Sequence, residues 1–430
     1  MSPSNIVTVA ACVFAYSLLS RWLSDRSISG PMVFVGMALI TAALDVKAFG
    51  GEFSGGGVEI LAEASLVIVL FSDATRIDLR RLRAQAGLPS RLLGIGLPLT
   101  VLAGTGIAML LFPDLGIFKA AVLAAILAPT DAALGQAVVS NPKVPIRVRQ
   151  GLNVESGLND GLMVPVVTIL VALAAAEDDT ATEWVAFVLR QIGFGVSAGV
   201  LVGALGAYLL SSFVNHNFVE GPLRQLAVLS IAVLAFGAAE LFEGNGFVAA
   251  FIAGVAFGAL ARDECEPATD FTQNQGELLV LLTFFFWGGF FVAPRLDELT
   301  VEVAVYAILS LTVVRMLPVA VAMLGVPVER ATIGYLGWFG PRGLASIIFG
   351  FFAVEHLEGT EAADTIMLVV TFTVLLSVVA HGLTAGPFAA KYGQLFATMQ
   401  HDAKGDMPES VHVEPFRTRT RGVGQEKPDS

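Results

Sequence analysis

The sequence predicts an all-α membrane protein with about 13 transmembrane helices. Of its 430 residues, 55% are hydrophobic and 14% are charged, whereas soluble domains contain about 25% charged residues. The mean hydropathy is +0.75. Short polar breaks separate apolar stretches of about 15 to 30 residues, which is typical of helices crossing a hydrocarbon core of about 30 Å and not of alternating barrel strands.

The first four expected spans, 6–20, 30–49, 58–71 and 91–112, are mainly apolar runs. The N-terminal MSPSN carries no positive charge and no small-residue cleavage site follows the first run, so we expect a retained span and not a signal peptide. Asp73 follows the third span. It either lines a cytoplasmic funnel that leads to a site or is a solvated span end.

The fifth expected span, 118–139, is interrupted near its middle by Pro129, Thr130 and Asp131. Proline removes a backbone donor and clashes with the preceding turn, which frees carbonyl groups. In transporters, broken helices use such carbonyls to coordinate ions at the membrane midplane. The alternative is a simple proline kink beside one aspartate.

The sixth expected span, 151–176, places the polar stretch NVESGLND ahead of a charge-free run. A carboxylate at bilayer depth costs at least a few kcal/mol and normally faces a cavity, a partner or an ion path. Ser156 and Asp160 lie four residues apart on one helix face, and Glu155 and Asn159 lie on a neighbouring face. A hydroxyl and a carboxylate suit a hard alkali cation; the alternative is that both faces join helices structurally.

The next five expected spans are 184–213, 223–242, 247–261, 278–292 and 301–324. The last of them contains Arg315, a deep cation that needs a partner. Because Asp131 and Asp160 are better suited to an ion, we expect a pair between Arg315 and Glu155.

The twelfth expected span, 331–354, carries Gly340, Pro341, Arg342 and Gly343 at its middle. The fifth and twelfth spans differ by an odd number of crossings, so these two interrupted helices run in opposite directions. Such an arrangement predicts an inverted repeat with two crossing unwound helices and a binding site where they meet. Arg342 also fits a role in stabilising the exposed helix ends.

The thirteenth expected span, 366–385, contains His381, which either packs and forms hydrogen bonds or senses protons. From residue 394 the chain is polar and contains too few apolar residues to fold. We therefore expect a transmembrane domain at 1–393 and a disordered cytoplasmic tail at 394–430.

The positive charges predict the orientation. With the C-terminus in the cytoplasm, most of the 25 Lys and Arg residues lie on cytoplasmic segments. Only Lys47, Lys119 and Arg295 lie on segments outside the cell. We expect a multi-pass protein of the cell inner (plasma) membrane with an outside N-terminus. Cys12 and Cys265 are separated by this topology, so no disulfide is expected.

Other functional classes have little support in the sequence. We find no phosphate-binding loop, nucleotide fingerprint, nucleophile elbow or clustered metal-ligand set, so we expect no enzyme, cofactor, nucleotide or nucleic-acid partner.

An intramembrane aspartyl protease would place glycine before its aspartates, whereas Asp131 follows Thr130 and Asp160 follows Asn159. A cation channel also uses buried carboxylates, and flux strictly coupled to protons would exclude it.

Four motifs resemble the bacterial NhaP-type members of the monovalent cation:proton antiporter family, relatives of the animal NHE exchangers. They are PTDA, ESGLNDG, GWFGPRGLAS and LLSVVAHGLTAGP, and they occur in the family's order. The resemblance implies an NhaA-like antiporter fold in a homodimer. Each protomer would have a core bundle, with the two unwound helices, and a dimerisation bundle.

The resemblance also implies roles for residues. Asp160 would bind a cation or a proton in turn, with Asp131, the Thr130 carbonyl and the Ser156 hydroxyl completing a Na⁺ site. Glu155 and Arg315 would form a supporting ion pair beside Asn159, in a polar network to which we add Arg342.

The implied activity is secondary antiport of Na⁺, or Li⁺ or K⁺, for H⁺, in pH and sodium homeostasis. A desolvated carboxylate has a raised proton affinity, so a proton and a cation compete for Asp160. Asn159 stands where electrogenic relatives carry a second aspartate, which implies electroneutral exchange of one cation for one proton.

Overall fold

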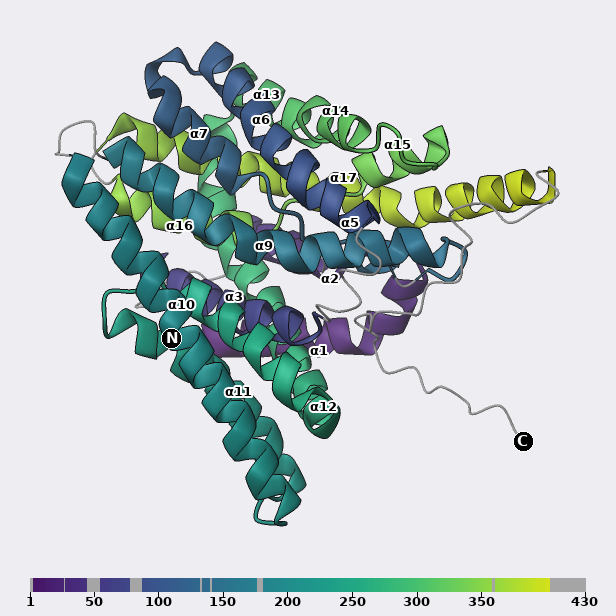
Figure 1. Cartoon of the computed structure of the whole chain (residues 1–430). Helices are drawn as coiled ribbons and strands as arrows, with labels where there is room; N and C mark the ends of the chain where they lie inside the picture. Colours follow the sequence, from purple (N-terminus) through teal and green to yellow (C-terminus); the bar gives the residue numbers. More distant parts are fainter. Residues whose placement is uncertain are drawn as a thin grey trace.

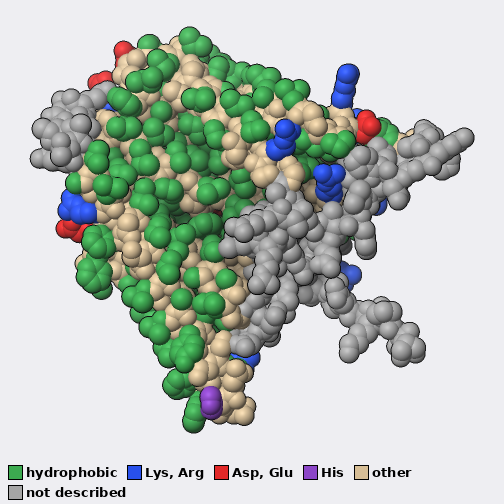
Figure 2. Space-filling model, in the orientation of Figure 1, with side chains coloured by type: hydrophobic (Ala, Val, Ile, Leu, Met, Phe, Trp, Pro, Cys, Tyr) green, Lys and Arg blue, Asp and Glu red, His purple; other side chains and the backbone are tan. Residues whose placement is uncertain are grey.

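The structure is a computed structural model that describes residues 3–26, 28–44, 55–77, 87–131, 134–139, 141–175, 181–357 and 360–402. Within these residues every regular element is a helix, which confirms the all-α prediction (Figure 1). On the face drawn in Figure 2, hydrophobic side chains cover most of the left and upper surface, and charged side chains are few and lie at its left and upper edges and toward the right. This distribution is expected for a protein whose middle contacts lipid tails.

The helices coincide closely with the expected spans. In order they are α1 Pro3–Asp25, α2 Gly30–Ala43, α3 Gly55–Thr75, α5 Gly87–Arg91, η1 Leu92–Gly96, α6 Leu97–Leu111, η2 Pro113–Leu115, α7 Gly116–Ile126, α8 Gln136–Val139, α9 Ile146–Ala175, α10 Ala181–Asn215, α11 Gly221–Glu240, α12 Gly246–Trp287, η4 Gly288–Val292, η5 Ala293–Glu298, α13 Val301–Leu311, α14 Val313–Ala322, α15 Arg330–Trp338, α16 Leu344–His356 and α17 Glu361–Asp402. Among the described residues, 8 helices are long and apolar enough to cross a membrane. Three shorter apolar helices accompany them. The chain is a multi-pass membrane protein.

The ninth and tenth predicted spans are two helices that meet at a kink. Both belong to α12, whose backbone leaves helical dihedral angles at Ala261 (φ −131°, ψ 20°), the expected end of the ninth span. The two spans are therefore distinct, as expected, and helix stands where a loop was expected between them. Low hydropathy ends a membrane span but does not end a helix, because charged and polar residues retain helix propensity.

The C-terminal helix also extends further than expected. α17 runs to Asp402, past the boundary expected at 393. The rest of the predicted tail lies outside the described residues.

Both predicted interruptions are present. The fifth span is helical as α7 up to Ile126 and again as α8 from Gln136, and the twelfth is helical as α15 up to Trp338 and as α16 from Leu344. A third interruption, at Thr312 between α13 and α14, was not predicted. No glycine or proline stands at Thr312 itself, whose hydroxyl donates to Ile308 O at 2.6 Å; Pro318 follows inside α14.

Close helix contacts join α12 to α10 and α3. Added Cβ atoms at Gly199 and Gly203 of α10 would overlap the Ala249 and Ala253 carbonyls of α12, so only glycine permits this approach. At Gly258 of α12 an added Cβ would overlap the Thr75 carbonyl at the end of α3. Small residues at such interfaces let membrane helices pack backbone to backbone. The three helices therefore form one tightly packed layer.

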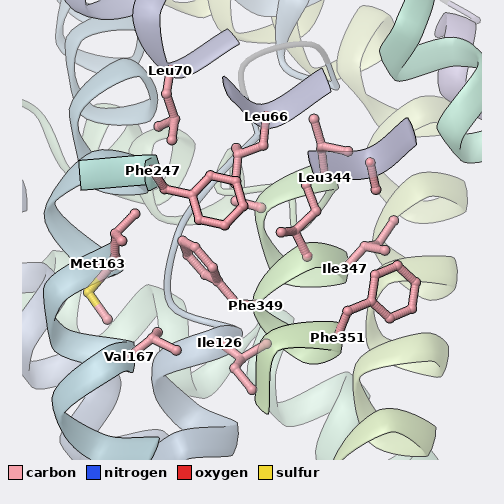
Figure 3. Packing of buried hydrophobic residues seen from close by; sticks show 14 of the residues in the cluster. Leu66, Leu70, Ile126, Met163, Val167, Phe247, Leu344, Ile347, Phe349 and Phe351 are labelled. Atoms are coloured by element: carbon pink, nitrogen blue, oxygen red, sulfur yellow. The ribbon is translucent and has the colours of Figure 1, made fainter. Parts of the chain in front are cut away.

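A second group of helices contains both interruptions. It includes α7, α9, α16 and α17, which contact one another. Figure 3 shows how this group meets the first: Leu66 and Phe247 of the α3–α12 layer lie beside Met163 of α9 and Phe349 of α16. The polar residues of the two interruptions thus lie within a mainly hydrophobic interior.

Candidate functional site

Asp131 joins the two interruptions. Its backbone N–H donates to Pro341 O at 2.7 Å, and its Oδ2 accepts from Leu344 N, the first residue of α16, at 2.9 Å. The other carboxylate oxygen accepts from Leu134 N at 3.1 Å. An Asp131 carboxylate therefore caps the N-terminus of α16, where negative charge is stabilised. An added Cβ at Gly343 would overlap Oδ2, so glycine makes this approach possible.

The carbonyls freed by the break in the fifth span are held by the twelfth. Arg342 Nη1 donates to Ala128 O and, at 3.0 Å, to Pro129 O. Ser346 Oγ donates to Ile126 O at 2.8 Å. The interpretation of Arg342 as a stabiliser of helix ends fits these bonds. Ser346 was not singled out in the sequence, because nothing local distinguishes it from a helix serine.

The polar stretch of α9 faces the same break. Thr130 Oγ1 lies 3.0 Å from Ser156 Oγ and accepts from Asn159 Nδ2 at 2.7 Å. Asp160 lies one turn along α9 from Ser156 and is 9% exposed. The structure therefore brings Thr130, Ser156 and Asn159 into direct contact and buries Asp160, the residue that follows Asn159.

A small cavity lies against Ser156. Its volume is about 10 Å³, enough for about one water molecule. Ser156 and Asn153 supply its polar side chains, and Leu152, Phe339 and Pro341 belong to its apolar wall. The cavity lies beside the Ser156 hydroxyl, and Asp131 and Asp160 do not line it.

The expected ion pair is present. Arg315 donates from Nη1 to Glu155 Oε1 at 2.6 Å and from Nη2 to Oε2 at 2.9 Å. Both side chains are 1% exposed. Asp73 of α3 is half-buried and lies against Gly157 of α9, one residue beyond Ser156. This position is compatible with the funnel interpretation.

The buried charges leave one negative charge in excess. Among the described residues, the buried acidic side chains are Asp131, Glu155 and Asp160, and the buried arginines are Arg315 and Arg342. If all five are ionised, the arginines offset two of the three carboxylates. The remaining charge needs one monovalent cation or one proton to become neutral. Within the described residues, no group of three or more His, Cys, Asp or Glu side chains could hold a resident metal ion.

Comparisons with known proteins agree with this architecture. The family model "Sodium/hydrogen exchanger, transmembrane" matches residues 6–391. The K(+)/H(+) antiporter NhaP of Alkalimonas amylolytica is 24% identical over 396 residues, which cover 89% of this chain and 66% of that protein. A Na(+)/H(+) antiporter of Schizosaccharomyces pombe is 24% identical over 315 residues, covering 66% of this chain and 67% of that protein.

A solved structure has the same fold. The sodium proton antiporter MjNhaP1 from Methanocaldococcus jannaschii, determined at pH 8, matches with a TM-score of 0.68 and 20% identity over 90% of this chain and 98% of that one. The fold class predicted from the sequence is therefore confirmed. The chain spans 66% of the length of the bacterial antiporter that it matches.

Proposed function

Because the chain belongs to the sodium/hydrogen exchanger family of monovalent cation:proton antiporters, we propose that it exchanges a monovalent cation for protons across the cell inner membrane. The observation that carries this proposal is the buried Asp160 of α9, one turn from Ser156, whose hydroxyl contacts Thr130 in the break of the fifth span. A transporter that binds one small cation needs oxygen ligands in a space closed to bulk water. Asp160, Ser156 and the Thr130 carbonyl provide them.

Competition at Asp160 accounts for the coupling. Burial disfavours an isolated carboxylate, so Asp160 is neutralised either by a proton or by a cation. A bound proton excludes the cation, and a bound cation excludes the proton. If the protein changes its facing direction only when the site is neutral, a cation carried one way requires a proton carried the other way.

Asp131 has a second role in this proposal. Its two oxygens accept backbone N–H groups from both broken spans. In this proposal Asp131 supports the bound cation and keeps the two breaks together. Asp160 is then the group that gains and loses the proton.

The charge balance supports a stoichiometry of one to one. With Glu155 paired to Arg315, the remaining Asp131, Asp160 and Arg342 carry one net negative charge. One proton or one cation cancels it. Exchange of one for the other moves no net charge.

We propose Na⁺ as the main cation, with Li⁺ or K⁺ as further substrates. A carboxylate and a hydroxyl are hard ligands for all three ions. The two curated relatives differ in this respect, since one is named for K(+) and the other for Na(+). The protein would serve pH and sodium homeostasis as a homodimer in the bilayer, with its N-terminus outside, its C-terminus in the cytoplasm and Asp73 in the cytoplasmic funnel.

The test is a transport assay with the full chain. Proteoliposomes that enclose a pH-sensitive dye and hold a proton gradient receive NaCl, LiCl, KCl or choline chloride in turn. Dequenching on alkali chloride addition, with none on choline chloride, is the expected result. No response to any alkali cation, in protein shown to be folded and inserted, would refute the proposed exchange.

A further inference from the structure

One face of α17 contacts both sides of the break in the twelfth span. Ser377, His381 and Thr384 lie four and three residues apart, so they share a helix face. Ser377 Oγ accepts from Arg342 N at 2.6 Å, and Thr384 Oγ1 accepts from Trp338 Nε1 at 2.9 Å. Trp338 ends α15, and Arg342 follows it within the break. Successive turns of α17 (Figure 1) thus bind both flanks of the interruption.

His381 connects these two contacts. Its Nε2 lies 2.9 Å from Trp338 O, and its Nδ1 lies 3.2 Å from Ser377 Oγ. The side chain is 1% exposed. The imidazole therefore bridges the last carbonyl of α15 and the serine that holds Arg342.

One protonation state satisfies all of these donors and acceptors. A carbonyl only accepts, so Nε2 carries a proton and donates to Trp338 O. The Arg342 N–H only donates, so Ser377 Oγ accepts from it and directs its own proton to His381 Nδ1. Each polar hydrogen then has an acceptor. A proton on Nδ1 would instead point to Ser377 O, at 3.0 Å, and would leave the Ser377 hydroxyl without this acceptor.

The hydrogen-bond chain ends at the candidate cation site. Arg342, whose N–H begins the chain, donates from its guanidinium to Ala128 O and Pro129 O of the fifth span. Two residues further, Leu344 N donates to Asp131. A shift of the break between Trp338 and Arg342 would therefore move these two donors, which hold the fifth span together with Ser346 Oγ.

We infer that His381 is a positioning residue for the exchange proposed above, on which this inference rests. As a neutral imidazole with its proton on Nε2, it fixes the break in the twelfth span at Trp338 and, through Ser377, at Arg342. Arg342 and Leu344 then meet the broken fifth span at the places that form the site. His381 contacts neither the cation nor the transferred proton in this scheme.

A packing role makes a different prediction. The His381 ring lies against the Trp338 ring, with centroids 5.3 Å apart, so a side chain of similar size would keep the packing. Leucine fills space without hydrogen bonds. Glutamine offers an amide donor and a carbonyl acceptor and can restore both bonds. The two substitutions therefore separate positioning from packing.

The experiment compares His381→Gln, His381→Leu and Ser377→Ala in full-length protein in proteoliposomes. Initial exchange rates are measured against Na⁺ concentration, and thermal unfolding is measured in detergent. Loss of a bond to a buried polar group predicts a fall of about tenfold in kcat/KM for His381→Leu and Ser377→Ala. His381→Gln should stay within about twofold of wild type. The matched control is His356→Leu, because His356 is exposed, bonds within its own helix and should leave exchange unchanged.

A measurement of protonation tests the chain of bonds without transport. In NMR spectra of ¹⁵N-histidine-labelled wild-type protein, the signals of His381 are identified by their absence from the spectrum of His381→Gln. These signals should show a protonated Nε2 and an unprotonated Nδ1. A proton on Nδ1 would overturn the inference. So would wild-type kcat/KM in His381→Leu, or equal losses in His381→Gln and His381→Leu at matched thermal stability. If wild-type protein exchanges no cation, the proposed function fails, and the labelled spectrum still decides whether this chain of bonds exists.

Discussion

Arg315 of α14 and Glu155 of α9 form a two-pronged ion pair inside the protein, with Nη1–Oε1 and Nη2–Oε2 distances of 2.6 and 2.9 Å. Gly340, in the break of the twelfth span, lies so close that an added Cβ would overlap Arg315 Nε. The pair therefore links α9 and α14 next to the break in the twelfth span. Because both charges are satisfied by each other, neither is free to hold a transported ion.

The first prediction concerns this pair. Arg315→Ala or Glu155→Ala leaves one buried charge without its partner, which typically costs about 3 to 5 kcal/mol. We expect a large fall in thermal stability in detergent and little change in the apparent cation affinity of the protein that stays folded. The exposed pair Arg190–Glu243, at 2.9 Å, provides the control, since Glu243→Ala should cost at most about 1 kcal/mol. A stable Arg315→Ala protein with altered ion selectivity would contradict this assignment.

The second prediction concerns Asp160. Asp160→Asn removes the negative charge for which the cation and the proton compete, so exchange should be abolished while the protein stays folded. Dye dequenching on NaCl addition measures exchange, and gel filtration in detergent measures folding and the expected dimer. The control is Asp73→Asn on α3. As a funnel residue, Asp73 should affect the cation concentration at half-maximal rate but not abolish exchange. Robust sodium-dependent proton release from Asp160→Asn would show that another group is shared.

The third prediction concerns Gly343. In Gly343→Ala the new Cβ would overlap Asp131 Oδ2, so the carboxylate must leave the N-terminus of α16 or the break must widen. We expect a strong loss of exchange. The control is Gly334→Ala in α15, where no atom lies within 4 Å of the new Cβ. This change should leave exchange intact and, because alanine favours helices, stabilise by up to about 1 kcal/mol. Equal activity of the two variants would argue against Asp131 as the link between the breaks.

The parts of the site that the sequence predicted have local causes. Pro129 and the GPRG stretch around Arg342 disfavour regular helix, so both breaks could be predicted from the residues themselves. Proline alone was not decisive, because Pro165 and Pro387 lie inside continuous helices. The partner of Arg315 followed from charge, because a deep cation requires a carboxylate and Glu155 remained unassigned.

Other features depend on distant parts of the chain. Asp131 Oδ2 binds a backbone N–H that is 213 residues away in sequence, and any residue except proline at position 344 would offer the same donor. Ser346 and Ser377 look like ordinary helix serines until the fold places them at the breaks. Thr312 carries no glycine or proline signal. Such contacts arise from tertiary structure, which periodicity and motif spacing do not specify.

The last prediction concerns charge movement and rests on Asn159. Its Nδ2 donates to Thr130 Oγ1 at 2.7 Å, and its side chain is fully buried. An amide at this position adds no charge. We therefore predict that Asp160 is the one group at the site that changes protonation, that one proton replaces one monovalent cation, and that no net charge crosses the membrane in a cycle.

Asn159→Asp is a poor test, because it adds a buried carboxylate without a counterion and removes the donor to Thr130. The wild-type protein is the better subject. Li⁺/H⁺ or Na⁺/H⁺ exchange is measured in liposomes clamped with potassium and valinomycin, after an assay with KCl and without valinomycin has shown whether K⁺ is itself a substrate. If K⁺ is transported, the clamp is set instead by a membrane-permeant anion. The initial rate should be the same at positive, zero and negative membrane potential. A rate that changes several-fold when the potential is reversed, or a sustained current after a sodium jump on a solid-supported membrane, would show that net charge moves and that a second group at the site titrates.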